Sequence, residues 1–172
     1  MNEWINVAVD WLIANPVEVF GAISGLIYIY FSIKQKIWLW LLGIITSATY
    51  VYVYFVSKFY ADMGLQVYYL VISIYGWYHW LYGSKSDEKD ELPVTSVDTK
   101  TWLVLALVTA AIWAFLNFIL TRYTDSDIAG WDAFTTATSI VATWMLAKKM
   151  LEQWLMWIFI DALCVVLYFY KE

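Results

Sequence analysis

The stretch that decides the fold is IWLWLLGIITSATYVYVYFV, residues 37–56. It contains no charged side chain, and about 20 apolar residues in a helix are enough to cross the hydrocarbon core of a bilayer. Similar apolar stretches lie before and after it, at residues 17–33, 65–82, 101–120, 131–147 and 152–170. The sequence therefore predicts an all-α integral membrane protein with about six transmembrane helices.

The composition supports a membrane environment. Apolar residues make up 63% of the 172 positions and charged residues only 15%, whereas about a quarter of the residues in an average globular chain are charged. The net charge of −5 argues against nucleic-acid binding. No phosphate-binding loop, catalytic dyad or Cys/His cluster is present, so we expect neither an enzyme nor a bound metal or cofactor.

The polar residues divide the chain into five parts. The linker at 83–100 contains Pro93 and most of the charges, which is typical of a solvated connection. The predicted parts are an interfacial segment at 1–16, a first three-helix unit at 17–82, this cytoplasmic linker, a connecting helix at 101–120, and a second unit at 131–172.

Basic residues are distributed unequally between alternate loops. One side has seven, Lys34, Lys36, Lys85, Lys89, Lys100, Lys148 and Lys149, and the other has three, Lys58, Arg122 and Lys171. Because cytoplasmic loops carry the excess of Lys and Arg, we expect the amino terminus to lie outside.

An internal repeat becomes visible when the chain is shifted by 114 residues. Matched pairs include Ser24 with Thr138 and Trp40 with Trp154. The match predicts a SWEET-like parallel repeat of three-helix bundles joined by one helix, with the substrate site between the repeats. A chance match of lipid-facing residues is the alternative. The same shift predicts a seventh core helix that starts near position 174, which lies beyond the last residue of this sequence. Three interpretations stay open: the sequence is truncated, another chain supplies the helix, or six helices suffice.

Two polar and aromatic stripes are candidates for the substrate site. At spacings of three and four residues, each stripe falls on one face of a helix. The stripes are Gln66, Tyr69, Ser73 and Trp77 in the third helix, and Trp154, Trp157 and Asp161 in the sixth. Asp161 is the strongest signal, because a carboxylate near the middle of a span costs about 2.5–3.5 kcal/mol on insertion scales. It either contacts substrate or pairs with a Ser or Thr inside the bundle.

Two further carboxylates, Glu18 and Asp132, occupy matching positions at the predicted starts of two helices. Stabilisation of the positive end of the helix dipole is the first interpretation, and a role in gating is the second.

The aromatic segment of the third helix resembles the signature of the PnuC vitamin transporters. The resemblance rests on YADMGLQVYY at 60–69 and YGWYHW at 75–80, with support from EQWLMW at 152–157. It implies a carrier for nicotinamide riboside or thiamine, both of them cations, by facilitated diffusion. A cytoplasmic kinase would then trap the solute, and the carrier itself would need no cofactor.

The leading hypothesis is therefore a multi-pass vitamin carrier in the bacterial inner membrane. A non-transporting six-helix membrane protein is the alternative from another class, and self-association into a homo-oligomer is left open.

Overall fold

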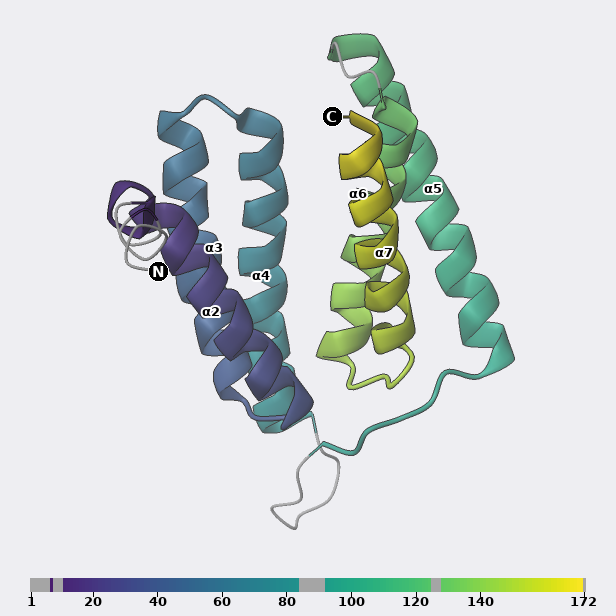
Figure 1. The fold of residues 1–172 in the computed structure, drawn as a ribbon. Coiled ribbons are helices and arrows are strands. Elements are labelled where there is room, and N and C mark those ends of the chain that lie inside the picture. The colour runs from purple at the N-terminus through teal and green to yellow at the C-terminus, as the bar shows by residue number, and fades with distance from the viewer. Residues whose placement is uncertain (1–6, 8–10, 84–91, 125–127, 172) are drawn as a thin grey trace. The chain divides into compact units, whose positions relative to one another are not determined.

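Long helices account for most of the chain. The computed structural model describes residues 7, 11–83, 92–124 and 128–171, without the side chains at 60, 61, 168, 170 and 171. The helices are α2 (Pro16–Ile33), α3 (Trp38–Val56), α4 (Tyr60–Tyr82), α5 (Thr99–Tyr123), α6 (Ala129–Ala147) and α7 (Gln153–Lys171) (Figure 1). Each predicted apolar stretch coincides with one of these helices, and the all-helical prediction is confirmed for the described residues.

Two helices extend beyond the predicted stretches. Helix α4 begins at Tyr60, and its first turn contains Asp62, where a carboxylate favours the positive end of the helix dipole. Helix α5 continues to Tyr123, with Arg122 in its last turn, where a cation is favoured. Polar end residues therefore lengthen these helices beyond the apolar core that the hydropathy pattern detects.

Three of the helices, α2, α3 and α5, are long and apolar enough on their own to cross a membrane. In α7 the apolar part, Gln153–Leu167, is shorter. Within the described residues, helices α4 and α6 do not combine the length and the apolar character needed to cross a membrane on their own. The reason in α6 is its series of hydroxyl side chains, among them the buried Thr138, Ser139 and Thr143.

The chain divides into two compact units, residues 1–77 and 78–172. In the first unit, α2 packs against α3, and Gly21 of α2 lies directly against the Tyr50 hydroxyl. Helices α3 and α4 approach each other closely at two points. Gly43 faces Ser73, and Gly76 faces the fully buried ring of Trp40.

Helix α6 is the central helix of the second unit and packs against both α5 and α7 (Figure 1). Its small residues allow this, since Ala133, Ala137 and Ala142 are fully buried. Leu105 of α5 joins Val141 and Met145 of α6 in the hydrophobic core of this unit. The Phe134 and Phe159 rings meet edge to face, with centroids 6.2 Å apart, and so link α6 to α7.

The turn between α6 and α7 anchors other parts of the second unit. Thr95 N–H donates to the Lys149 carbonyl, and Leu151 N–H donates to the Thr95 carbonyl, each at 2.9 Å. Trp80 Nε1 donates to the Ala147 carbonyl at 3.1 Å, and Lys149 Nζ lies 4.3 Å from the centroid of the Trp80 ring. The sequence predicted only a solvated connection at 83–100, and it missed this pairing because the partners are far apart in the chain.

The structure describes only part of the predicted interfacial segment and of the predicted linker. Most of the interfacial segment at 1–16 lies outside the described residues, although residues 11–14 are helical and α2 begins at Pro16. Helix α5 begins at Thr99, where the Asp98 side chain accepts a hydrogen bond from Thr101 N–H at 3.3 Å.

Candidate functional site

The stripe predicted on α4 lies largely on the side of the helix that packs within the first unit. Gln66 and Tyr69 are half-buried, and Ser73 is only 4% exposed. Trp77 lies at the edge of this face, with 38% of its surface exposed. The stripe therefore presents an amide, a phenol and an indole from one helix, while Ser73 is largely inside the packing.

The environment of Ser73 explains its burial. A Cβ atom added to Gly43 would lie 2.7 Å from Ser73 Oγ and 3.6 Å from Cε2 of Tyr28. Gly43 is thus the residue that lets α2 and α4 approach α3 at this level, because it has no side chain to separate them.

Tyr28 is a polar residue of this region that the sequence analysis did not single out. It lies near Tyr69 and next to Gly43. The buried Ser47 follows Gly43 one turn later on α3. Tyr28 lies four residues after the buried Ser24 and seven after Gly21, a spacing that could have placed it on the same face of α2. Hydroxyl groups from three helices therefore gather in the first unit, where they can donate and accept hydrogen bonds.

The stripe predicted on α7 flanks the packed face of that helix in the second unit. Trp154 and Trp157 are half-buried, whereas Asp161 is exposed. The packed face itself contains Gln153, only 2% exposed, and Ile160, 3% exposed. Asp161 therefore lies beside the packed face rather than within it.

Within the described part of the chain, Asp161 forms no hydrogen bond or ion pair with a Ser, Thr or basic side chain. Cys164, one turn further along α7, lies near the Asp161 carboxylate and also near that of Asp132 from α6. The structure thus brings the region of Asp132 towards the same stretch of α7, which the sequence analysis did not anticipate.

The helix-start carboxylates lie where the sequence placed them. Glu18 is in the first turn of α2 and exposed, and Asp132 is in the first turn of α6 and half-buried. Both positions favour a negative charge because the helix dipole is positive there.

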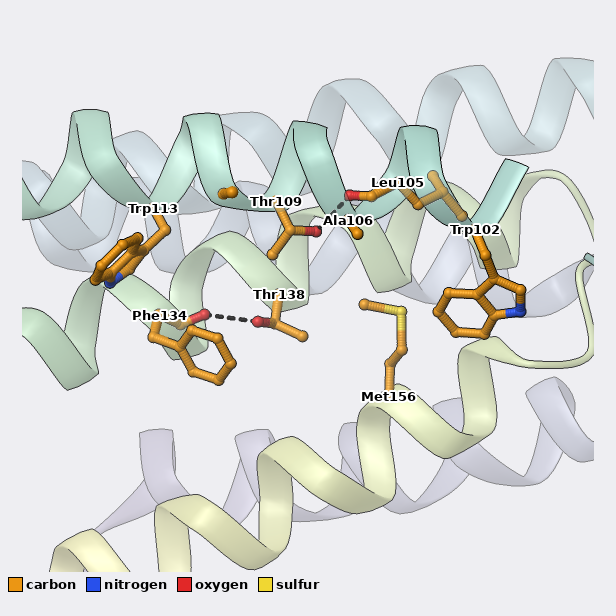
Figure 2. Close-up of a pocket in the computed structure, with 9 residues that line it drawn as sticks. Trp102, Leu105, Ala106, Thr109, Trp113, Phe134, Thr138 and Met156 are labelled. Atoms are coloured by element: carbon orange, nitrogen blue, oxygen red, sulfur yellow. Dashed lines mark hydrogen bonds between the residues drawn. The ribbon is translucent and has the colours of Figure 1, made fainter. Parts of the chain in front are cut away.

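A separate cavity of about 500 Å³ lies between α5, α6 and α7 (Figure 2). Trp102 and Trp113 of α5, Phe134 of α6 and Met156 of α7 contribute to its wall. None of the residues predicted for the substrate site lines this cavity. Among the described residues, no group of three or more His, Cys, Asp or Glu side chains is arranged to hold a metal ion.

Comparisons with known proteins place these features in a family. A family model described as "Nicotinamide mononucleotide transporter" matches residues 15–172. The nicotinamide riboside transporter PnuC of Escherichia coli is 25% identical over 177 residues, which cover 88% of this chain and 73% of the relative. PnuC of Haemophilus influenzae is 27% identical over 152 residues, covering 87% and 67%.

A relative with a different named solute is also found. The riboflavin/roseoflavin transporter RibM of Streptomyces davaonensis is 24% identical over 156 residues, covering 88% of this chain and 71% of the relative. The crystal structure of the vitamin B3 transporter PnuC superposes with a TM-score of 0.70 at 22% identity. This superposition covers 99% of this chain and 76% of the other, and it shows that the two share a fold.

These relatives are transporters and not enzymes, and they confirm the resemblance drawn from the segments at 60–69 and 75–80. With its apolar helices, the chain is a multi-pass membrane protein. Because the family model matches almost the whole chain, the protein belongs to the nicotinamide mononucleotide transporter family.

Proposed function

We propose that the protein is a membrane carrier for nicotinamide riboside, with thiamine as the alternative cationic solute. The observation that carries this proposal is the similarity to PnuC proteins, which are named for nicotinamide riboside and match 86–88% of this chain. Transport is by facilitated diffusion, and phosphorylation by a cytoplasmic kinase keeps the solute inside the cell.

The chemistry of the α7 stripe supports a cationic solute. Asp161 offers a carboxylate that has no hydrogen-bond or ion-pair partner among the described residues. Trp154 and Trp157 offer ring faces, and a cation over such a face gains about 0.5–2 kcal/mol. Together these groups favour a flat, positively charged ring such as a pyridinium.

The α4 stripe supplies polar groups that suit the remainder of a riboside. The Gln66 amide can both donate and accept hydrogen bonds, and the Tyr69 hydroxyl can do the same. Ser73 and Trp77 belong to the same proposed stripe. We assign substrate-binding residues to the α4 stripe and to the α7 stripe, each within its own unit, with gating by Glu18 and Asp132 as a secondary role beside helix capping.

The proposed architecture is a parallel repeat, in which α2 and α3 correspond to α6 and α7. Helix α2 ends at Ile33 and α6 ends at Ala147, which are 114 residues apart. Gln35 and Lys149, also separated by 114 residues, both have positive φ angles, 50° and 53°. Two turns with the same uncommon backbone conformation at the same shift support the repeat.

In the proposed topology all six helices cross the inner membrane, with the amino terminus outside and the linker at 83–100 in the cytoplasm.

Uptake into liposomes tests the proposal. Purified protein in vesicles without ATP should equilibrate radiolabelled nicotinamide riboside across the membrane without concentrating it, and enclosed riboside kinase with ATP should produce accumulation. Concentration of the free solute in the absence of kinase would contradict facilitated diffusion. Absence of any uptake, with binding retained, would favour the non-transporting alternative.

The substitution Asp161→Asn tests the role of charge. It retains the shape of the side chain and removes one negative charge, so binding of nicotinamide riboside should weaken by about fivefold or more, since a close charge pair is worth about 1–4 kcal/mol between water and the protein surface. Asp62→Asn, at an exposed position in the first turn of α4, is the matched control and should leave affinity unchanged. Equal affinity in Asp161→Asn would remove Asp161 from the site.

Riboflavin is a third candidate solute, because the chain also resembles RibM over 88% of its length. Riboflavin is neutral, so its binding should not depend on Asp161. Competition among nicotinamide riboside, thiamine and riboflavin for the same uptake activity separates the three candidates, and the strongest competitor identifies the solute.

A further inference from the structure

The cavity between α5, α6 and α7 is not explained by vitamin transport. Trp102 and Trp113 lie at its two ends on α5, and Met156 closes part of it from α7 (Figure 2). Its hollow shape has a simple origin, because Ala106 and Ala110 lie one turn apart on α5 and both line it. Two small side chains in succession leave room that larger residues would fill.

The wall of this cavity offers almost nothing polar to a ligand. Its two hydroxyl side chains, Thr109 and Thr138, already donate to the carbonyl groups of Leu105 and Phe134, at 2.8 Å and 2.7 Å (Figure 2). A nucleoside would leave its own donors and acceptors unsatisfied there, which disfavours its binding. The cavity therefore suits a hydrocarbon chain.

The length of the cavity matches one leaflet of a bilayer. Trp102 and Trp113 are separated by 11 residues, which span about 16 Å at about 1.5 Å per residue. Half of a hydrocarbon core of about 30 Å is about 15 Å. Helix α5 is also the most apolar of the three helices that are long and apolar enough to cross a membrane. Its most apolar 18-residue stretch has a mean hydropathy of 2.5, and only 6% of that stretch is buried in the protein. Lipid acyl chains are thus the neighbours of this helix.

Basic side chains lie at the Trp102 end. Lys100 is exposed in the first turn of α5, two residues before Trp102. Lys148 Nζ lies 5.9 Å from the centroid of the Trp144 ring. Trp144 packs against the hydrophobic core that includes Leu105, and Leu105 also lines the cavity. The positive charge of these two ammonium groups would stabilise a phosphate that lies near them.

We propose that this cavity binds one acyl chain of an anionic phospholipid, whose phosphate group lies near Lys100 and Lys148. Trp102 lies at the level of the headgroup, where tryptophan is favoured at the membrane interface. The chain extends along α5 towards Trp113, whose indole Nε1 donates to the Gly130 carbonyl at 3.1 Å and thereby holds the far end of the cavity closed against α6.

Native mass spectrometry tests the proposal with lipids of matched chain length. Protein taken from mixed vesicles should retain one phosphatidylglycerol molecule in preference to phosphatidylcholine. Ala110→Phe places a ring in the cavity and should reduce retention at least tenfold. Ala111→Phe is the matched control, because Ala111 is exposed on the same helix and does not line the cavity. Ala106→Leu fills less space, and it keeps the test valid if Ala110→Phe fails to fold.

The headgroup is tested separately. Lys100→Ala and Lys148→Ala should each lower the preference for phosphatidylglycerol about fivefold, equivalent to about 1 kcal/mol. Arg122→Ala, at the other end of α5, should not change it. Equal lipid retention in Ala110→Phe and wild type would overturn the proposal, as would a preference that survives loss of both lysines. A protein dimer that disappears in Ala110→Phe would instead assign the cavity to a second copy of the chain.

Discussion

The contact between Gly76 and Trp40 gives the sharpest test of how the first unit is packed. A Cβ atom added to Gly76 would lie 2.5–2.6 Å from three atoms of the Trp40 indole ring, Cζ2, Cε2 and Cη2. The ring cannot move away easily, because Trp40 is fully buried. Gly76→Ala should therefore force α3 and α4 apart near Ser73, which lies one turn earlier on α4.

The size of the effect follows from two opposing contributions. Alanine is favoured over glycine in a helix by about 1 kcal/mol. Overpacking of a close-packed interior costs about 1–3 kcal/mol. The net effect of Gly76→Ala is thus a loss of about 0–2 kcal/mol in the free energy of unfolding, from the difference of these two contributions.

Gly64→Ala on the same helix isolates the packing contribution. A Cβ atom at Gly64 would meet no atom within 4 Å, so this variant should gain up to about 1 kcal/mol from helix propensity alone. Unfolding by sodium dodecyl sulfate in mixed micelles, followed by circular dichroism, measures both variants under one condition. Their difference should equal the overpacking cost of about 1–3 kcal/mol.

Equal stability of Gly76→Ala and Gly64→Ala would refute the packing argument. A double-mutant cycle with Trp40→Phe provides a second check, since phenylalanine lacks the indole atoms that the new Cβ would meet. The cost of Gly76→Ala should then shrink in the Trp40→Phe background, with an interaction energy of about 0.5–3 kcal/mol.

Three further outcomes concern the second unit. The Asp98 carboxylate accepts hydrogen bonds from Thr101, which lower the pKa of Asp98. The stabilisation that ionised Asp98 gives is therefore present above the ordinary pKa of 3.8 and is lost as the pH falls below that value. Asp98→Asn should remove this acid dependence of the melting temperature. Trp80→Phe takes the indole donor from the buried Ala147 carbonyl and should lower the free energy of unfolding by about 1–3 kcal/mol in the same micelle titration. Thr95→Pro removes the amide that donates to Lys149 and should speed hydrogen exchange at Leu151, whereas Thr95→Ala should leave it unchanged.

The helices could be predicted because they depend on local sequence. Residues 37–56 have no charge and enough apolar length, and α3 occupies Trp38–Val56. The start of α2 at Pro16 is also a local property, because the fixed φ angle of proline suits the first turn of a helix. Each of these signals lies within the element that it specifies, so no knowledge of packing was required.

The candidate site was predictable only as two stripes. Spacing at three and four residues puts Gln66, Tyr69 and Ser73 on one side of α4, but it could not show that Ser73 would be packed against Gly43. Spacing could have placed Tyr28 on the packed face of α2, but its position beside Gly43 depends on how closely α2 and α3 approach. Such distances are set by the side chains on both helices together.

By itself, the sequence determined that this is a helical membrane protein, where its helices lie, and to which transporter family it belongs, because apolar length and an aromatic signature are properties of consecutive residues. Only the tertiary structure decided what lies beside what. It tied Thr95 to the turn between α6 and α7, pressed Trp40 against Gly76, and left a cavity beside Ala106 and Ala110. The physical reason is that packing depends on complementary side-chain volumes from separate helices, and no single stretch of the chain contains that information.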